Sequence, residues 1–128
     1  MTDCIFCKLP KEAVMAENEL AFTIYDKYPV NPGHVLVLPR RHYSSCFDIT
    51  EEELSALHSL VLDIKKVLDD KYSPDGYNIG INVGECAGQV VRHVHLHVIP
   101  RFNGDSPRPG GLRRVKNPAT PWERESEV

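Results

Sequence analysis

The sequence predicts a single α+β domain in which an antiparallel sheet packs against one long helix. Three observations predict it: strand-like runs joined by turn residues, one stretch with helical periodicity, and no regular alternation of strands and helices. The chain has 128 residues, 41% hydrophobic and 26% charged, as in an ordinary soluble domain. A chain of this length buries roughly two thirds of its unfolded surface, which suffices for one core.

Two apolar runs rich in β-branched and aromatic residues, at 19–26 and 34–39, are the first predicted strands. The seven residues between them include Pro29, Pro32 and Gly33, which favour a turn. We therefore expect these two strands to be neighbours.

One long amphipathic helix is predicted to follow. Thr50 and Glu53 form a capping-box pattern at its start. Apolar residues then recur at spacings of three and four, at Leu54, Leu57, Val61, Ile64 and Leu68. The helix should end near Tyr72, because Ser73 to Gly76 is a turn sequence.

The remaining chain is predicted to add two strands and a tail. Residues 77–83 alternate apolar with small or polar side chains, which predicts a strand, and residues 84–89 have loop composition. Residues 90–100 are the last predicted strand. We expect a domain over residues 1–103 and an extended tail over residues 104–128.

Charge and hydropathy exclude some classes of protein. Fifteen basic against eighteen acidic residues give a net charge of -3, which argues against a nucleic-acid partner. Apolar stretches are too short to span a membrane, and no apolar signal core follows Asp3. We expect a cytoplasmic protein, where the close pair Cys4 and Cys7 is a metal or redox device rather than a disulfide.

The main chemical signal is a histidine triplet. His93, His95 and His97 alternate with aliphatic residues, so on a strand all three imidazoles project from one face. Two functions remain open. In the first, the three imidazoles hold a catalytic zinc ion. In the second, one imidazole attacks an electrophilic phosphorus while its neighbours stabilise the developing charge.

The loop before the triplet favours the second function. Gly84, Ala87 and Gly88 permit close backbone approach, and successive N–H groups in such a loop can form an anion nest. Gln89 and Asn82 add side-chain donors. These features predict a phosphate site beside the imidazoles.

Residues 87–100 resemble the signature of the histidine-triad (HIT) family, three histidines alternating with apolar residues. Further family landmarks occur in the same order at 4–8, 20–22, 31–39 and 41–42, so the resemblance covers roughly residues 3–103. It implies an antiparallel five-stranded sheet with one long helix and a short N-terminal helix. It also implies a homodimer with adjoining sheets.

The resemblance further implies cleavage at the α-phosphate of a nucleoside polyphosphate, such as a dinucleoside polyphosphate, or of a phosphoramidate. A covalent nucleotidyl-His95 intermediate would form, and nucleoside monophosphate would be released. The implied companions are His97 and His34 for catalysis, Asn82, Gly88, Gln89 and His97 for phosphate, Asp26 for the ribose, and Ile5, Phe6, Phe22 and Ile24 for the base.

A zinc site is the second implied feature. Cys4-x-x-Cys7 supplies only half of the four ligands that structural zinc requires. The resemblance to the zinc-binding branch of the family implies that His42 and His93 supply the other half. One structural zinc per chain would then leave His95 free to attack.

The chain departs from the family pattern at Val90, where many relatives carry Ser or Thr near the leaving group. Without that hydroxyl, phosphoanhydride hydrolysis is favoured over phosphoramidate cleavage. Three alternatives remain open: a phosphorylase or transferase, a nucleotide-binding regulatory module with little turnover, and a hydrolase with zinc on the triad, which chelation would inactivate.

Overall fold

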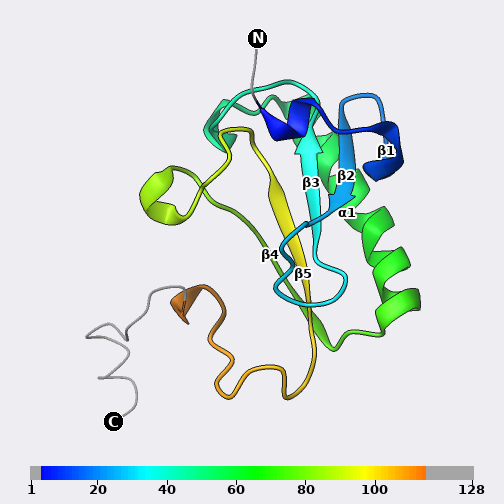
Figure 1. The fold of residues 1–128 in the computed structure, drawn as a ribbon, viewed down its shortest axis with the longest axis vertical. Coiled ribbons are helices and arrows are strands. Elements are labelled where there is room, and N and C mark those ends of the chain that lie inside the picture. The colour runs from blue at the N-terminus through cyan, green and yellow to red at the C-terminus, as the bar shows by residue number, and fades with distance from the viewer. Residues whose placement is uncertain (1–3, 115–128) are drawn as a thin grey trace.

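The computed structural model describes residues 4–114, and its centre is a five-stranded antiparallel sheet beside one long helix (Figure 1). The predicted α+β architecture is thus confirmed. The strand order across the sheet is β1-β2-β3-β5-β4. The bounds are β1 Val14–Glu17, β2 Ala21–Tyr25, β3 Val35–Pro39, α1 Glu51–Tyr72, β4 Gly76–Ile81 and β5 Leu96–Arg101.

Helix α1 covers one face of the sheet, where it forms the larger core (Figure 1). The predicted capping box is present, with Thr50 and Glu53 each accepting from the other's backbone N–H. The buried face differs from the predicted one by about one position, because Leu54 is exposed whereas Glu53 and Leu60 are buried. The core side chains are Ala21, Val35, Val37, Leu57, Leu60, Ile64, Leu68 and Val98.

The opposite face of the sheet carries a second, smaller core. Every residue of β3 is buried, because alternate side chains point into one core or the other. The N-terminal segment covers this second core through Phe6, which packs with residues of β2 and β3. This face also carries the histidines.

Two strand predictions need correction. The last strand begins at Leu96 rather than at residue 90, because the N–H of Val94 donates to Tyr43 O instead of a neighbouring strand. Strand β1 was missed: it is four residues long, has no polar alternation, and its pairing with β2 shifts register between Val14 and Ala16. Neither the late start of β5 nor strand β1 produces a hydrophobic periodicity that could be recognised in the sequence.

The implied N-terminal helix is a single 3-10 turn at Ile5–Cys7. Other 3-10 turns lie at Lys11–Ala13, Cys46–Asp48, Glu85–Ala87 and Gly111–Arg114. Of the predicted tail 104–128, residues 115–128 lie outside the described residues, as do residues 1–3 of the predicted domain. Among residues 4–114, no helix combines the length and hydropathy needed to cross a bilayer.

Glu53 joins the start of α1 to the segment after β3, and its loss should destabilise the fold. Its carboxylate accepts from Arg41 Nε and Nη2 at 3.0 and 2.8 Å and from the Tyr43 hydroxyl at 3.1 Å. We expect Glu53→Gln to lower the free energy of unfolding by about 2 kcal/mol at pH 7. The exposed neighbour Glu52→Gln, in the same helical turn, should change it little.

The pH dependence of that difference has a defined sign. Hydrogen bonds from Arg41 are the main reason that the pKa of Glu53 falls from its ordinary 4.5 to about 2, against the opposing effect of burial. The ionised form is therefore favoured in the folded state, and its stabilisation is complete above about pH 4.5. It should disappear as the pH falls toward 2. Urea titrations across this range would contradict the prediction if Glu53→Gln kept a constant deficit.

Candidate functional site

The histidines form a continuous row on the sheet face opposite α1. Ring centroids are 5.1 Å apart between His42 and His93, 5.1 Å between His95 and His97, and 5.2 Å between His97 and His34. Phe6 bridges the row, with its ring 5.9 Å from His93 and 5.2 Å from His95. The structure thus brings together the predicted histidines: His97 from β5, His93 and His95 from the segment before it, His34 from the residue before β3 and His42 from the loop after β3.

The His95 imidazole has a fixed tautomer. Its Nδ1 lies 2.7 Å from the carbonyl oxygen of His93. A carbonyl can only accept, so Nδ1 carries the hydrogen and the neutral ring keeps an unprotonated lone pair on Nε2. The side chain is only 8% exposed and packs edge-on against Phe6. This ring is oriented to present Nε2 as a nucleophile.

His34 and His97 form a directly bonded pair. Val30 N–H donates to His34 Nδ1 at 3.0 Å, so in the neutral ring the hydrogen of His34 is on Nε2. That Nε2 lies 2.9 Å from His97 Nδ1 and 3.3 Å from Asp26 Oδ2. His97 Nδ1 is therefore an acceptor, and the neutral His97 ring carries its hydrogen on Nε2, where a substrate oxygen could receive it.

Both rings of this pair are neutral at pH 7. Burial is the main cause that lowers the pKa of His97 to about 4, and the nearby His95 and His34 lower it further. Burial also lowers the pKa of His34, although the negative charge of Asp26 acts in the opposite direction. Neutral rings at His34 and His97 avoid the repulsion that two adjacent cations would create.

Cys4, Cys7, His42 and His93 form a compact four-residue cluster, with all ligand atoms within 4.8 Å of one another. His93 Nδ1 lies 3.4 Å from Cys4 Sγ and 3.6 Å from Cys7 Sγ, and Cys7 Sγ lies 3.3 Å from His42 Nδ1. Tetrahedral zinc with ordinary Zn–S and Zn–N bonds separates its S and N ligands by roughly 3.5 Å. The four predicted ligands thus match such a site in type, number and spacing.

The hydrogen bond of the other ring nitrogen of His93 also fits a zinc ligand. Its Nε2 lies 2.8 Å from Pro39 O, so Nε2 carries the hydrogen and Nδ1 turns its lone pair toward the thiols. His93 is fully buried, and burial lowers its pKa, which favours the neutral form that a metal needs.

The alternative of a zinc ion held by the triad itself does not match the geometry. Nδ1 of His95 is bonded to a carbonyl, and His93 faces the cysteines. Asp26, His34 and His97 also lie within 4.8 Å of one another. The N–H of Val30, however, places the hydrogen of neutral His34 on the Nε2 that would have to ligate, so this trio suits proton transfer better than metal binding.

The loop at residues 84–89 is built differently from the predicted anion nest. The N–H groups of Ala87, Gly88 and Gln89 donate to carbonyls of Gly84 or Glu85 within the loop. The Gln89 amide donates to Ser44 O and Val91 O and accepts from Gly84 N–H, so it shapes the loop. Direct phosphate contacts of Gly88 and Gln89 stay predictions, and their observed bonds are structural.

Gly88 is favoured by its backbone conformation, not by a lack of space beside Asn82. Its φ of 100° is unfavourable for other residues, and a Cβ atom there would lie 3.6 Å from the Asn82 amide nitrogen. Asn82 lines a 440 Å³ groove together with His34 and His97. Its amide thus faces a groove in which a ligand could contact the histidine pair. Val90, at the position where many relatives carry Ser or Thr, is 89% exposed.

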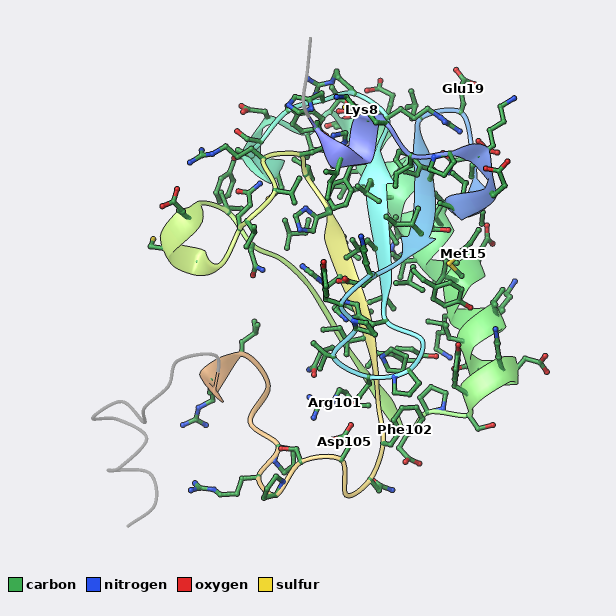
Figure 2. The ribbon with its side chains drawn as sticks, in the orientation of Figure 1. Lys8, Met15, Glu19, Arg101, Phe102 and Asp105 are labelled. Carbon is green, nitrogen blue, oxygen red and sulfur yellow. The ribbon has the colours of Figure 1, made fainter. Side chains whose placement is uncertain are left out.

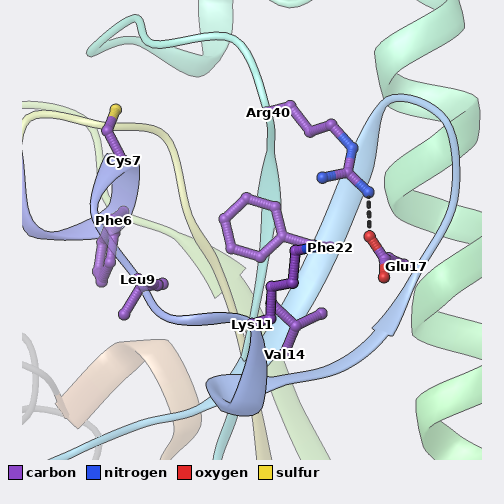
Figure 3. A pocket seen from close by; sticks show the side chains of 8 residues that line it. All are labelled: Phe6, Cys7, Leu9, Lys11, Val14, Glu17, Phe22 and Arg40. Atoms are coloured by element: carbon purple, nitrogen blue, oxygen red, sulfur yellow. Dashed lines mark hydrogen bonds and ion pairs between the residues drawn. The ribbon is translucent and has the colours of Figure 1, made fainter.

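A separate 530 Å³ hollow lies between the N-terminal segment and β2, lined by side chains that include Phe6 and Phe22 (Figure 3). Of the predicted base-binding residues, Phe6 and Phe22 line it, whereas Ile24 is buried in the smaller core and Ile5 is exposed. Cys7, predicted as a zinc ligand, also lines the hollow, and no sequence pattern predicted the other lining residues, which are Leu9, Lys11, Val14, Glu17 and Arg40.

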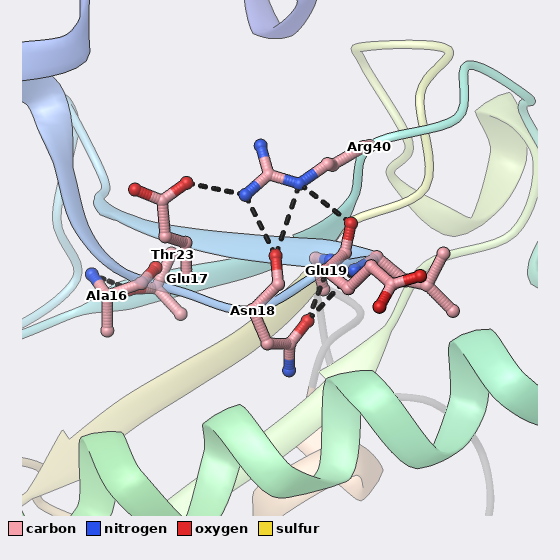
Figure 4. Close-up of polar contacts among 8 residues, drawn as sticks. Ala16, Glu17, Asn18, Glu19, Thr23 and Arg40 are labelled. Carbon is pink, nitrogen blue, oxygen red and sulfur yellow. Dashed lines mark hydrogen bonds and ion pairs between the residues drawn. The ribbon is translucent and has the colours of Figure 1, made fainter.

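Arg40 is held at the rim of this hollow by the turn between β1 and β2 (Figure 4). It donates to Asn18 O, Glu19 O and the Glu17 carboxylate, and its guanidinium lies 5.8 Å from the Phe22 ring centroid. The hollow therefore combines an aromatic wall with a fixed cation. Only its place directly after the strand ending at Pro39 could have pointed to Arg40.

Comparison with known proteins finds relatives over most of the chain. An uncharacterised HIT-like protein of Methanocaldococcus jannaschii is 40% identical over 108 residues, covering 80% of this chain and 81% of the relative. The AP-4-A phosphorylase of Mycobacterium tuberculosis is 36% identical over 94 residues, covering 73% and 48%. The asymmetrical bis(5'-nucleosyl)-tetraphosphatase of Schizosaccharomyces pombe is 39% identical over 101 residues, covering 78% and 56%. The chain thus spans about half of the length of these two enzymes.

Solved structures show the same fold. A HIT family protein from Bacillus anthracis superposes with a TM-score of 0.77 at 32% identity, covering 98% of this chain and 92% of the other. The family model described as the HIT domain matches residues 9–104, which is more than half of the sequence. The chain therefore belongs to the HIT domain family.

Proposed function

We propose that the protein cleaves at the α-phosphate of a nucleoside polyphosphate, such as a dinucleoside polyphosphate, and transfers the nucleotidyl group through His95. The observation that carries this proposal is the bond from His95 Nδ1 to His93 O, which places the hydrogen of the neutral ring on Nδ1 and keeps the lone pair of Nε2 for attack. The names of the Mycobacterium tuberculosis and Schizosaccharomyces pombe relatives support a dinucleoside tetraphosphate as the first substrate class to test.

In the first step, the lone pair of His95 Nε2 forms a bond to the α-phosphorus. The bond from that phosphorus to the bridging oxygen breaks, and the oxygen leaves with the electron pair. The hydrogen on His97 Nε2 can bond to the departing oxygen, and His34 Nε2–H supports His97 through Nδ1. The positive charge that develops is on the His95 ring, while Asp26 Oδ2, 3.3 Å from His34 Nε2, helps to hold His34 in place.

In the second step, an oxygen of water or of inorganic phosphate attacks the phosphorus of nucleotidyl-His95. The N–P bond breaks, its electron pair returns to Nε2, and the proton of an attacking water passes to solvent. Water yields nucleoside monophosphate, and phosphate yields nucleoside diphosphate. Hydrolase and phosphorylase thus share all residues of the first step.

The two cavities divide the substrate between them. We place the base in the 530 Å³ hollow against Phe6 and Phe22, since Phe6 lines that hollow and also contacts the His95 ring. The ribose hydroxyls would donate to Asp26, and the α-phosphate would accept from Asn82 and His97 beside the 440 Å³ groove. Ile24 and Ile5, which do not line the hollow, would act only indirectly.

A structural zinc ion completes the proposal. Cys4, Cys7, His42 and His93 would hold it, and when bound it would cross-link the N-terminal segment, the loop after β3 and the residues before β5. The reaction would not pass through it. We further propose a homodimer, as the family resemblance implies, and a cytoplasmic location, with residues 1–103 as the HIT-like domain and 104–128 as the tail.

Product analysis on a substrate panel tests this function. We expect chromatography to show nucleoside monophosphate released from dinucleoside polyphosphates, and more slowly from nucleoside phosphoramidates because Val90 supplies no hydroxyl donor. Parallel reactions with inorganic phosphate distinguish the acceptor, because a phosphorylase forms nucleoside diphosphate only there. Tight nucleotide binding without product in either series would contradict catalysis and favour a regulatory nucleotide-binding module.

A further inference from the structure

Asp105 occupies an unusual place: it follows the last residue matched by the HIT domain model and belongs to the predicted tail, yet its carboxylate lies against the domain and accepts four hydrogen bonds. Its Oδ1 accepts from Arg101 Nη2 at 2.7 Å, and its Oδ2 accepts from Arg101 Nε at 3.0 Å. Oδ2 also accepts from Phe102 N–H and from Asn31 Nδ2, each at 2.8 Å. Figure 2 shows Arg101, Phe102 and Asp105 together at the end of the sheet far from Lys8.

Arg101 anchors this carboxylate to the sheet. Its Nη1 donates to Asn78 Oδ1 at 2.7 Å, so the guanidinium connects β4, the end of β5 and Asp105. The bidentate contact with Arg101 holds the pKa of Asp105 well below its usual range, with further help from Phe102 N–H. The carboxylate is therefore charged and fixed at any pH near neutrality.

Asn31 carries the connection toward the histidines. Its amide nitrogen donates both to Asp105 and, at 2.9 Å, to Pro100 O, so both amide hydrogens are used. Its own carbonyl accepts from His34 N–H at 3.2 Å. The preceding residue, Val30, donates its N–H to His34 Nδ1. Asn31 thus ties the tip of the loop at residues 26–34 to the end of β5.

We propose that Asp105 is a positioning residue for the His34–His97 pair, acting through Asn31. Its carboxylate holds the loop so that Val30 N–H meets His34 Nδ1, which fixes the tautomer in which His34 Nε2–H faces His97. The effect on turnover rests on the proposed function, whereas the effect on the His34 tautomer does not. The first residues of the tail therefore belong to the functional domain.

Asp105→Ala tests the tautomer first. Heteronuclear NMR of the imidazole nitrogens should show, in the wild type, an unprotonated Nδ1 and a protonated Nε2 for His34. In Asp105→Ala the two signals should move toward values averaged over both tautomers. Asp75→Ala is the matched control, because Asp75 anchors the same segment through Asn103 N–H at 2.8 Å without contacting Asn31. It should leave the His34 signals unchanged.

Kinetics then test the path through Asn31. We expect Asp105→Ala and Asn31→Ala each to lower kcat about tenfold or more, with KM nearly unchanged, because the pair is misplaced while the nucleoside site is intact. The double variant should be no slower than the slower single variant, since both remove the same connection. Asp75→Ala should retain wild-type kcat.

Three results would overturn the inference: unchanged His34 signals in Asp105→Ala, additive effects on kcat in the double variant, or an equal loss in Asp75→Ala. If the wild type releases no product from any substrate, the proposed function fails, but the NMR comparison still decides the positioning role. If Asp105→Ala does not fold, Asn31→Ala provides the same tautomer readout from the other side of the contact.

Discussion

Replacing His95 by alanine should lower the release of nucleoside monophosphate by at least about a thousandfold, because the attacking nitrogen is removed outright. No neighbour can substitute for it. His93 faces the cysteines, and His97 Nδ1 is bonded to His34. Initial rates of wild type and variant on the best substrate of the panel measure this loss.

The matched control is His58→Ala, an exposed histidine on α1 that lies on the far side of the sheet from the row. It should retain wild-type activity. Binding of nucleoside monophosphate by His95→Ala, measured by calorimetry, should persist, because Phe6 and Phe22 line a separate hollow. A variant that binds and still turns over within about tenfold of wild type would remove His95 from its proposed role.

The second large effect is on stability. We expect the purified protein to contain about one zinc per chain by elemental analysis, and Cys4→Ala to lose it. Because a structural zinc site contributes directly to folding free energy, the Tm should fall by at least about 10 °C. The remaining folded protein should lose proportionally less turnover, since the reaction does not pass through the ion.

Cys46→Ala provides the control, because Cys46 belongs to neither cluster of potential metal ligands among the described residues. Its zinc content and Tm should stay close to those of the wild type. Substoichiometric zinc in gently purified wild-type protein would contradict the site, and so would an equal fall in Tm for the two variants.

The sequence predicts most of the regular elements because their signals are local. The periodicity of α1 and the Thr50–Glu53 box need only neighbouring residues, and the alternation in β4 is equally local. Strand β1 and the late start of β5 depend on what the backbone pairs with, which a periodic pattern does not record. The bond from Val94 N–H to Tyr43 O is such a long-range choice.

The site likewise has parts that the sequence predicts and parts that depend on long-range contacts. Spacing and resemblance were enough to nominate the four potential zinc ligands, which the structure brings within 4.8 Å. They could not supply the tautomers, because those depend on backbone groups of Val30, Pro39 and His93. Nor could they show that the glycine loop uses its own N–H groups, or that Asp105 reaches Asn31 across the sheet end.

The central claim is covalent catalysis by His95, and the most direct test is the intermediate itself. Wild-type protein mixed with a dinucleoside polyphosphate, quenched rapidly in alkali and analysed by intact and peptide mass spectrometry, should carry one nucleoside monophosphate group on His95. The adduct should decay as product appears and be absent from His95→Ala. Continued turnover with no adduct at any quench time, or an adduct on a different residue, would contradict the mechanism.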